Sequence, residues 1–143
     1  MTRYLLDTNI ICNIVKPRPS TTLLDWMAEQ RDEDLFISSL TVAEIARGVW
    51  EMPDGKKRRE LERWFTGPEG PSQLFAGRVL AFDVDAGMAW ALLMADGKRH
   101  GKPRGAFNTM IAAIAATNDC VVVTDNEKDY TGLKFINPMR ARA

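Results

Sequence analysis

Short apolar segments that alternate with helical segments constrain the fold of this chain more than any other feature. Apolar residues recur at helical spacing between them, as in Ile10, Ile11, Ile14 and Val15. Strands this short and this apolar are typical of a parallel sheet covered by helices. The sequence therefore predicts an α/β fold with a mostly parallel central sheet flanked by helices. The predicted strands are Tyr4–Leu6, Leu35–Ser38, Val79–Phe82, Cys120–Thr124 and Lys134–Ile136.

Length and composition indicate one soluble domain. The 143 residues suit a single core, so we expect one domain over residues 1–143. The 19 basic residues balance 19 acidic ones, which argues against disorder and against a strongly basic nucleic-acid binder. Two cysteines, Cys12 and Cys120, are too few for a disulfide framework, and we expect buried free thiols. No secretory signal and no apolar run of about 20 residues is visible, which predicts a cytoplasmic protein without membrane contact.

Local signals place the helix and loop boundaries. Ser20 can cap a helix that carries Leu23 and Met27, and another helix is expected to end before Pro53. Gly67–Ser72, with two glycines and two prolines, is predicted to be a loop. A helix rich in alanine and isoleucine is predicted from about Phe107 to Thr117.

Acidic residues follow the predicted strands. Asp7 ends the first strand, and Asp125 and Asp129 follow the Val-Val-Val-Thr strand. Glu44 comes after the second strand, in the first turn of the predicted helix. Since ligands bind beyond the carboxyl ends of parallel strands, these acids are candidates for a site. Each also has a structural interpretation: Asp7 as a helix cap, Thr41 and Glu44 as a capping box, and Asp125 as part of an Asp-Asn turn.

Convergence of the acids predicts a cation. Several carboxylates within a few ångströms repel one another and raise one another's pKa. A divalent cation relieves this cost, and carboxylate oxygens suit Mg²⁺ or Mn²⁺. Taken together, the acids favour a site for a hard metal ion over the alternative that each of the four is an independent helix cap or turn residue.

These segments resemble a known family, the PIN-domain ribonucleases, and most of all the VapC-type toxins of bacterial toxin–antitoxin pairs, including their FitB-like branch. No single block is specific to the family. The combination of blocks is specific, because they come in family order over nearly the whole chain. The blocks are Leu5-Leu6-Asp7-Thr8-Asn9, Ser39-Leu40-Thr41-Val42-Ala43-Glu44-Ile45, Phe107-Asn108-Thr109-Met110-Ile111-Ala112-Ala113, Val122-Val123-Thr124-Asp125-Asn126, Lys128-Asp129-Tyr130 and Phe135-Ile136-Asn137-Pro138.

The resemblance implies an endoribonuclease that uses Mg²⁺ or Mn²⁺ held by acidic residues. Asp7 and Glu44 match the first two acids of the family. The last acid falls within Asp125–Asp129, where Asp129 and Asn126 are the leading candidates and Asp125 follows. The metal would orient and activate a water for hydrolysis of an RNA phosphodiester.

Asn108 departs from the family pattern. It stands where the family places its third acid, at the start of the Ile-Ala-Ala helix. An amide oxygen can still bind a metal, but it carries no charge, so affinity and turnover should fall. Asn108 could also be a helix N-cap. Two explanations remain open: a natural variant with lowered activity, or a deliberate inactivation that allows a lethal ribonuclease to be expressed.

Substrate and partner expectations follow from basic residues and from the resemblance. Lys98, Arg99, Lys102 and Arg104 are candidates for contacts to RNA phosphates, or else a solvated helix end favoured by the helix dipole. His100 is expected to be a solvated residue rather than a general base. The family implies a homodimer, a VapB-type antitoxin whose tail crosses the active site, and operator DNA bound only through that antitoxin. Transfer RNA is a plausible substrate.

Two functions of other classes remain as alternatives. In the first, the chain is a non-catalytic binding module, with Asn108 marking a decayed site. In the second, it is a phosphate-handling α/β domain, such as a haloacid-dehalogenase-like phosphatase or a receiver domain. Asp7-Thr8-Asn9 lacks the second Asp that the phosphatase motif requires, and no clear Lys follows a late strand as a receiver domain requires.

Overall fold

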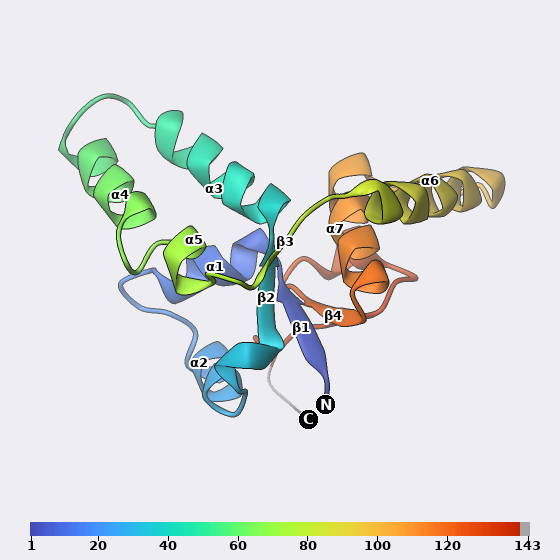
Figure 1. The fold of residues 1–143 in the computed structure, drawn as a ribbon, viewed down its shortest axis with the longest axis horizontal. Helices are drawn as coiled ribbons and strands as arrows, with labels where there is room; N and C mark the ends of the chain where they lie inside the picture. Colours follow the sequence, from blue (N-terminus) through green and yellow to red (C-terminus); the bar gives the residue numbers. More distant parts are fainter. Residues whose placement is uncertain (141–143) are drawn as a thin grey trace.

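A computed structural model describes residues 1–140, so the end of the predicted domain at residue 143 lies outside the described residues. The chain forms the predicted α/β fold, a parallel sheet with helices on both sides (Figure 1). In chain order, the elements are β1 (Arg3–Leu6), α1 (Thr8–Ile14), α2 (Thr21–Ala28), η1 (Asp32–Asp34), β2 (Leu35–Ser38), α3 (Ser39–Trp50), α4 (Lys56–Thr66), α5 (Pro71–Leu74), β3 (Val79–Leu80), α6 (Val84–Arg99), α7 (Ala106–Thr117), β4 (Cys120–Val123), η2 (Glu127–Tyr130) and β5 (Phe135–Ile136).

The sheet has the order β3-β2-β1-β4-β5, and each neighbouring pair is parallel. In the centre, Tyr4 pairs with Leu35 on one side and Val121 on the other. The chain first builds the sheet outward through β2 and β3, and then crosses back to place β4 on the opposite side of β1. The strand order therefore reverses between β1 and β4, and ligands of such folds bind beyond the carboxyl ends of the strands at that point.

Alternating strand residues build a core on each face of the sheet. On one face, Leu6, Ile37 and Val123 pack with residues of α1, α2 and α3 and with Phe75, which follows α5. On the other face, Leu5 and Val122 pack with α6, α7 and Tyr130. Successive strand residues point to opposite faces, so a four-residue strand supplies both cores. In Figure 1, α6 and α7 lie together on one side of β1, and α3, α4 and α5 on the other.

Helix caps differ from the sequence prediction at two sites. Ser20 caps α2 as predicted, and its Oγ accepts from the Leu23 amide at 3.2 Å. The predicted capping box at Thr41 and Glu44 is wrong, because Ser38 caps α3 and accepts from the Thr41 amide at 3.0 Å. Asn108 is not a cap either, since α7 already begins at Ala106 with Gly105 as its N-cap. The side-chain oxygen of Ser38, at the end of β2, thus starts α3 earlier than the sequence pattern indicates, whereas α7 begins without a side-chain cap.

Smaller differences concern a loop and a thiol. The predicted loop Gly67–Ser72 ends early, because Pro71 begins the short helix α5, a position where its missing N–H costs nothing. Cys120 is buried as predicted, whereas Cys12 is exposed, so its predicted burial is wrong. Among residues 1–140, no helix is long and apolar enough to cross a membrane.

Candidate active site

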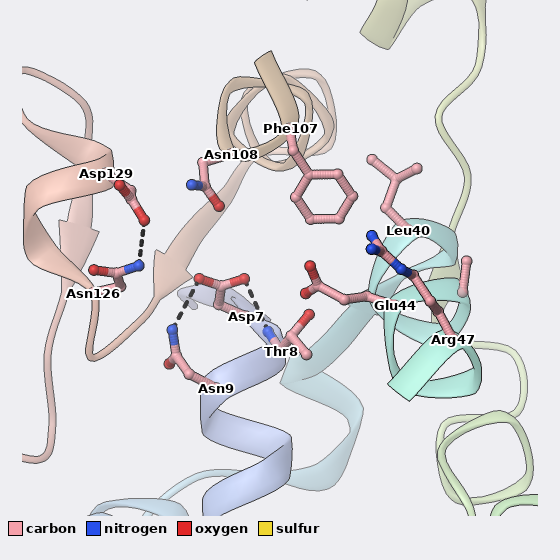
Figure 2. A pocket seen from close by; sticks show the side chains of 11 residues that line it. Asp7, Thr8, Asn9, Leu40, Glu44, Arg47, Phe107, Asn108, Asn126 and Asp129 are labelled. Carbon is pink, nitrogen blue, oxygen red and sulfur yellow. Dashed lines mark hydrogen bonds between the residues drawn. The ribbon is translucent and has the colours of Figure 1, made fainter. Parts of the chain in front are cut away.

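Most of the acids and amides predicted to form the site line one cavity, which lies at the carboxyl ends of β1 and β4. The cavity has a volume of about 720 Å³. Asp7 follows β1, Glu44 comes from α3, Asn108 from α7, and Asn126 and Asp129 from the segment after β4 (Figure 2). The full lining is Asp7, Thr8, Asn9, Leu40, Ala43, Glu44, Arg47, Phe107, Asn108, Asn126 and Asp129. The reversal of strand order between β1 and β4 thus brings Asp7, Glu44 and Asp129 to the lining of one cavity.

Asp7 is the most rigidly held side chain of the cavity. It is 4 % exposed, and its Oδ1 accepts from the Thr8 amide at 2.9 Å, so it also caps α1. Its Oδ2 accepts from Thr124 Oγ1 at 2.9 Å, from Tyr130 Oη at 3.2 Å and from Asn9 Nδ2 at 3.3 Å. The structural and functional interpretations of Asp7 are therefore compatible. Three donors on one oxygen fix the plane of the carboxylate.

Burial and hydrogen bonding act on the Asp7 charge in opposite directions. Burial raises the pKa of Asp7 above its ordinary value, and the negative charge of Glu44 adds to the rise. Hydrogen bonds from Thr124, the Thr8 amide and Tyr130 lower the same pKa. Burial and the Asp7 charge also raise the pKa of Tyr130 well above its usual range, so its hydroxyl remains a donor. A cation in the cavity would relieve the cost of ionised Asp7.

Glu44 faces the same cavity from an exposed position. Because α3 begins at Ser39, Glu44 lies in the second turn rather than in the predicted first turn. Leu40 and Arg47 are four residues before and three residues after it, which puts all three on one helix face. In Figure 2, Glu44 points toward Asp7, and the Arg47 guanidinium lies beside it. Arg47 also donates to Glu51 at 2.8 Å.

Asn108 approaches from the opposite wall, in the first turn of α7. Its side chain is directed toward Asp7 in Figure 2, with Phe107 next to it. The amide makes no hydrogen bond to another residue among those the structure describes, which leaves it free to face a ligand. Asn108 therefore completes the wall at the place where a third acid is expected, with an oxygen but without a charge.

The segment after β4 supplies the last part of the cavity. Asn126 Nδ2 donates to Asp129 Oδ2, and both residues line the cavity. Asp125 is not part of the lining, and its Oδ1 accepts from Asn137 at 3.2 Å. Asn126 and Asp129 therefore share the cavity with Asp7 and Glu44, whereas Asp125 does not.

The donor set suits a hard cation, although the acids do not form a ready-made cluster. Within residues 1–140, no group of three or more His, Cys, Asp or Glu side chains could hold a metal ion. Mg²⁺ is usually held by one or two carboxylates together with waters and substrate phosphates. Asp7, Glu44 and the oxygen of Asn108 fit that pattern.

Four predicted basic residues divide into two pairs. Lys102 and Arg104 line a second cavity next to the first, whereas Lys98 and Arg99 lie exposed on the last turn of α6 and line neither. His100 follows α6, and its Nδ1 lies 3.2 Å from the Asp96 carboxylate; it lines the second cavity and is not part of the acid cavity lining.

Sequence reasoning missed several supporting residues. Asn9, Thr124 and Tyr130 hold Asp7, and the sequence motifs contain all three without a sign of that role. Phe107 is 37 % exposed at the cavity wall, and the sequence indicated only that it begins a helix. A position just after a strand identifies the acids as candidates in the sequence. Contacts between segments more than a hundred residues apart leave no pattern in the sequence that could be recognised.

Comparison with known proteins relates this chain to one protein family. The model of the family described as "PIN domain" matches residues 4–132. The chain is 39 % identical over 136 residues to VapC ribonuclease Y4jK of Sinorhizobium fredii, covering 94 % of this chain and 96 % of that protein. It is 36 % identical over 120 residues to toxin FitB of Neisseria gonorrhoeae, covering 84 % and 85 % of the two chains.

A solved structure shares the fold over nearly the full length. A chain in the structure of FitAB bound to an IR36 DNA fragment superposes with a TM-score of 0.87 at 31 % identity, covering 98 % of each chain. The likeness extends across the sheet and the walls of the cavity rather than to a single motif.

Proposed function

The chain belongs to the PIN-domain family, and from that premise we propose that it is a VapC-type toxin that hydrolyses RNA phosphodiesters with the aid of Mg²⁺ or Mn²⁺. Two relatives support the proposal by name, one as a ribonuclease and one as a toxin. The observation that carries it is the meeting of Asp7, Glu44 and Asn108 in one cavity at the reversal of strand order.

Each residue has a distinct task in this proposal. Asp7 presents a fixed carboxylate whose orientation is set by its three donors. Glu44, which is exposed, can adjust to a water or a phosphate oxygen. Asn108 contributes a neutral oxygen, and Asn126 keeps Asp129 oriented at the rim. The cation, when bound, supplies activation of water and neutralises the charge that develops on the phosphate. Residues 1–143 act together as a single domain.

The amide at position 108 lowers activity in this proposal. The cavity contains one charge fewer than the four acids that the family pattern implies, and its acids do not cluster closely enough to hold a metal by themselves. This same observation favours a second candidate function, a non-catalytic binding module with a decayed site. Both explanations of Asn108, a natural low-activity form and a deliberate inactivation, predict recovery when the acid is restored.

The Asn108→Asp variant separates the two functions. Purified parent and variant are incubated with labelled RNA, including transfer RNA, in Mn²⁺ or Mg²⁺ and in EDTA. We expect cleavage to rise at least about tenfold in the variant, to require the cation and to disappear in the matched double variant Asn108→Asp/Glu44→Gln. If Asn108→Asp cleaves no RNA, and its expression does not slow growth, the ribonuclease proposal fails and the binding module stands.

The partners are also part of the proposal. We propose a homodimer in the cytoplasm, neutralised by a VapB-type antitoxin, with operator DNA bound only through that antitoxin. The FitAB structure supports this in part, because it is a structure of FitAB bound to a DNA fragment. Gel-shift experiments test it: the chain alone should leave a fragment of its own promoter unshifted, and addition of the product of the adjacent gene should shift it.

A further inference from the structure

A second cavity of about 710 Å³ lies between the end of α6, the loop that leads to α7, and the segment after η2. Lys102 and Arg104 line it from the loop, and Lys128 lines it from η2. Asp129 lines both this cavity and the acid cavity, so the two are adjacent. We call the second one the basic cavity.

Three cationic side chains line the basic cavity against two acidic ones. Asp96 has His100 at 3.2 Å, and Asp129 accepts from Asn126. Lys102, Arg104 and Lys128 form no ion pair with any residue among positions 1–140. The cavity therefore has an excess of available positive charge, in contrast to the acid cavity beside it.

Arg104 is held in place by backbone rather than by an acid. A Cβ added at Gly97 would lie 3.0 Å from the Arg104 Cγ and 2.7 Å from the Lys102 carbonyl oxygen, so the Arg104 stem packs directly on the glycine. Arg104 Nη1 donates to the Thr131 carbonyl at 3.2 Å, and the buried Nε has no partner. The guanidinium bridges two loops and retains N–H groups for a ligand. An Arg fixed in this way loses little side-chain entropy on binding an anion.

We propose that the basic cavity binds a backbone phosphate of the RNA next to the scissile phosphodiester, with Lys102, Arg104 and Lys128 as its ligands. This proposal rests on the ribonuclease function, since a phosphodiester held at Asp7 and Glu44 leads the neighbouring nucleotides along the shared wall at Asp129. An RNA strand presents one negative charge at each nucleotide, and Arg and Lys are the side chains that bind phosphate oxygens.

The structure also supplies matched controls. Lys98 and Arg99 lie within a few residues of Lys102, have the same charge and are likewise exposed, but they line neither cavity. A diffuse electrostatic attraction would treat all of these cations alike. A defined phosphate site would depend on the lining residues only.

The test measures RNA binding in EDTA, so that no cleavage occurs. Fluorescence anisotropy of a labelled single-stranded RNA is followed with the full chain at several salt concentrations. We expect Lys102→Ala and Lys128→Ala each to weaken binding about fivefold to tenfold and to reduce the slope of log affinity against log salt by about 0.7. Lys98→Ala and Arg99→Ala should change affinity less than about twofold. Arg104→Lys, which retains the charge and loses the fork, should weaken binding while preserving the fold.

Equal losses in the control and cavity variants, or no loss in either, would overturn the proposal, as would absence of RNA binding by the parent. A glutamate-rich peptide of equal charge is the competing ligand. If it binds as tightly as RNA and depends on the same lysines, the cavity is a site for an acidic protein segment and the phosphate assignment fails. Because no turnover is needed, this result is independent of the Asn108→Asp cleavage test: loss of cleavage alone rejects the ribonuclease function, and equal binding losses reject only the cavity assignment.

Discussion

Replacement of Tyr130 by Phe tests whether the buried hydroxyl holds the Asp7 carboxylate. The Tyr130 side chain is fully buried, and its Oη lies 3.2 Å from Asp7 Oδ2. Phe retains the ring that packs near Phe135, so the variant removes one donor and leaves no large cavity. The change therefore isolates a single hydrogen bond to a buried charge.

The expected cost is modest. A hydrogen bond to a charged group contributes about 1.5–3 kcal/mol, and this one is longer than the Thr124 bond and shares its acceptor with two other donors. We expect a loss of about 1 to 1.5 kcal/mol in the free energy of unfolding at neutral pH without metal. For a chain of this length, that corresponds to a fall of about 4 to 6 °C in Tm.

The pH dependence identifies the mechanism. Burial raises the pKa of folded Asp7 above 3.8, so its contribution to stability is present at low pH and is lost as the pH rises through the folded value. The Tyr130 bond lowers that pKa, so Tyr130→Phe raises it further and enlarges the loss. The difference between parent and variant should be largest above the folded pKa of Asp7, where Asp7 is ionised, and should narrow as the pH falls through that pKa.

Denaturant unfolding of both proteins in EDTA, at several pH values, measures this difference. Tyr4→Phe is the matched control, since Tyr4 packs edge-to-face on Trp26 and is outside the Asp7 network. A Tyr130→Phe deficit that is the same at every pH, or that equals the Tyr4→Phe deficit, would refute the argument that the hydroxyl acts on the Asp7 charge.

Two further variants probe the cation and the backbone. Mn²⁺ at ten times its dissociation constant should stabilise the parent by about 1.4 kcal/mol, and Glu44→Gln should abolish this gain without lowering the metal-free Tm, because Glu44 is exposed. Thermal unfolding with and without Mn²⁺ checks both parts, and an undiminished gain would remove Glu44 from the site. Gly70→Ala should lower Tm by more than about 4 °C, since its Cβ would meet the Phe65 carbonyl oxygen at a forbidden distance. An unchanged Tm would contradict the close approach.

Most of the fold can be predicted from the sequence, because a parallel sheet with two covered faces leaves a strong apolar pattern. The Val121–Val123 run is buried on both sides, as its composition indicates. Helix starts were harder, since Ser38 and Gly105 compete with Thr41 and Asn108 as caps and all are plausible from local sequence alone. These choices depend on where each strand ends in three dimensions.

The site divides in a similar way. Asp7, Glu44 and Asn108 could be named because each follows a strand or lies at a helix start in a known motif, and the reversal of strand order brings them together. The roles of Tyr130 and Lys128 could not be predicted, since each depends on a contact or a cavity shared with distant segments. Periodicity shows that Tyr130 is near apolar residues, but it does not show that its hydroxyl reaches Asp7.

In the proposed cation site, Asn108 affects stability and cation binding through the same electrostatic interaction. With an amide there, Asp7 is repelled by Glu44, but position 108 adds no third negative charge. A carboxylate at 108 would raise the pKa of Asp7 further in the absence of metal, because like charges disfavour ionisation. It would also strengthen attraction for a divalent cation, by the same Coulomb interaction with the opposite sign. The amide therefore favours the metal-free fold at the expense of cation affinity, and the acid reverses that balance.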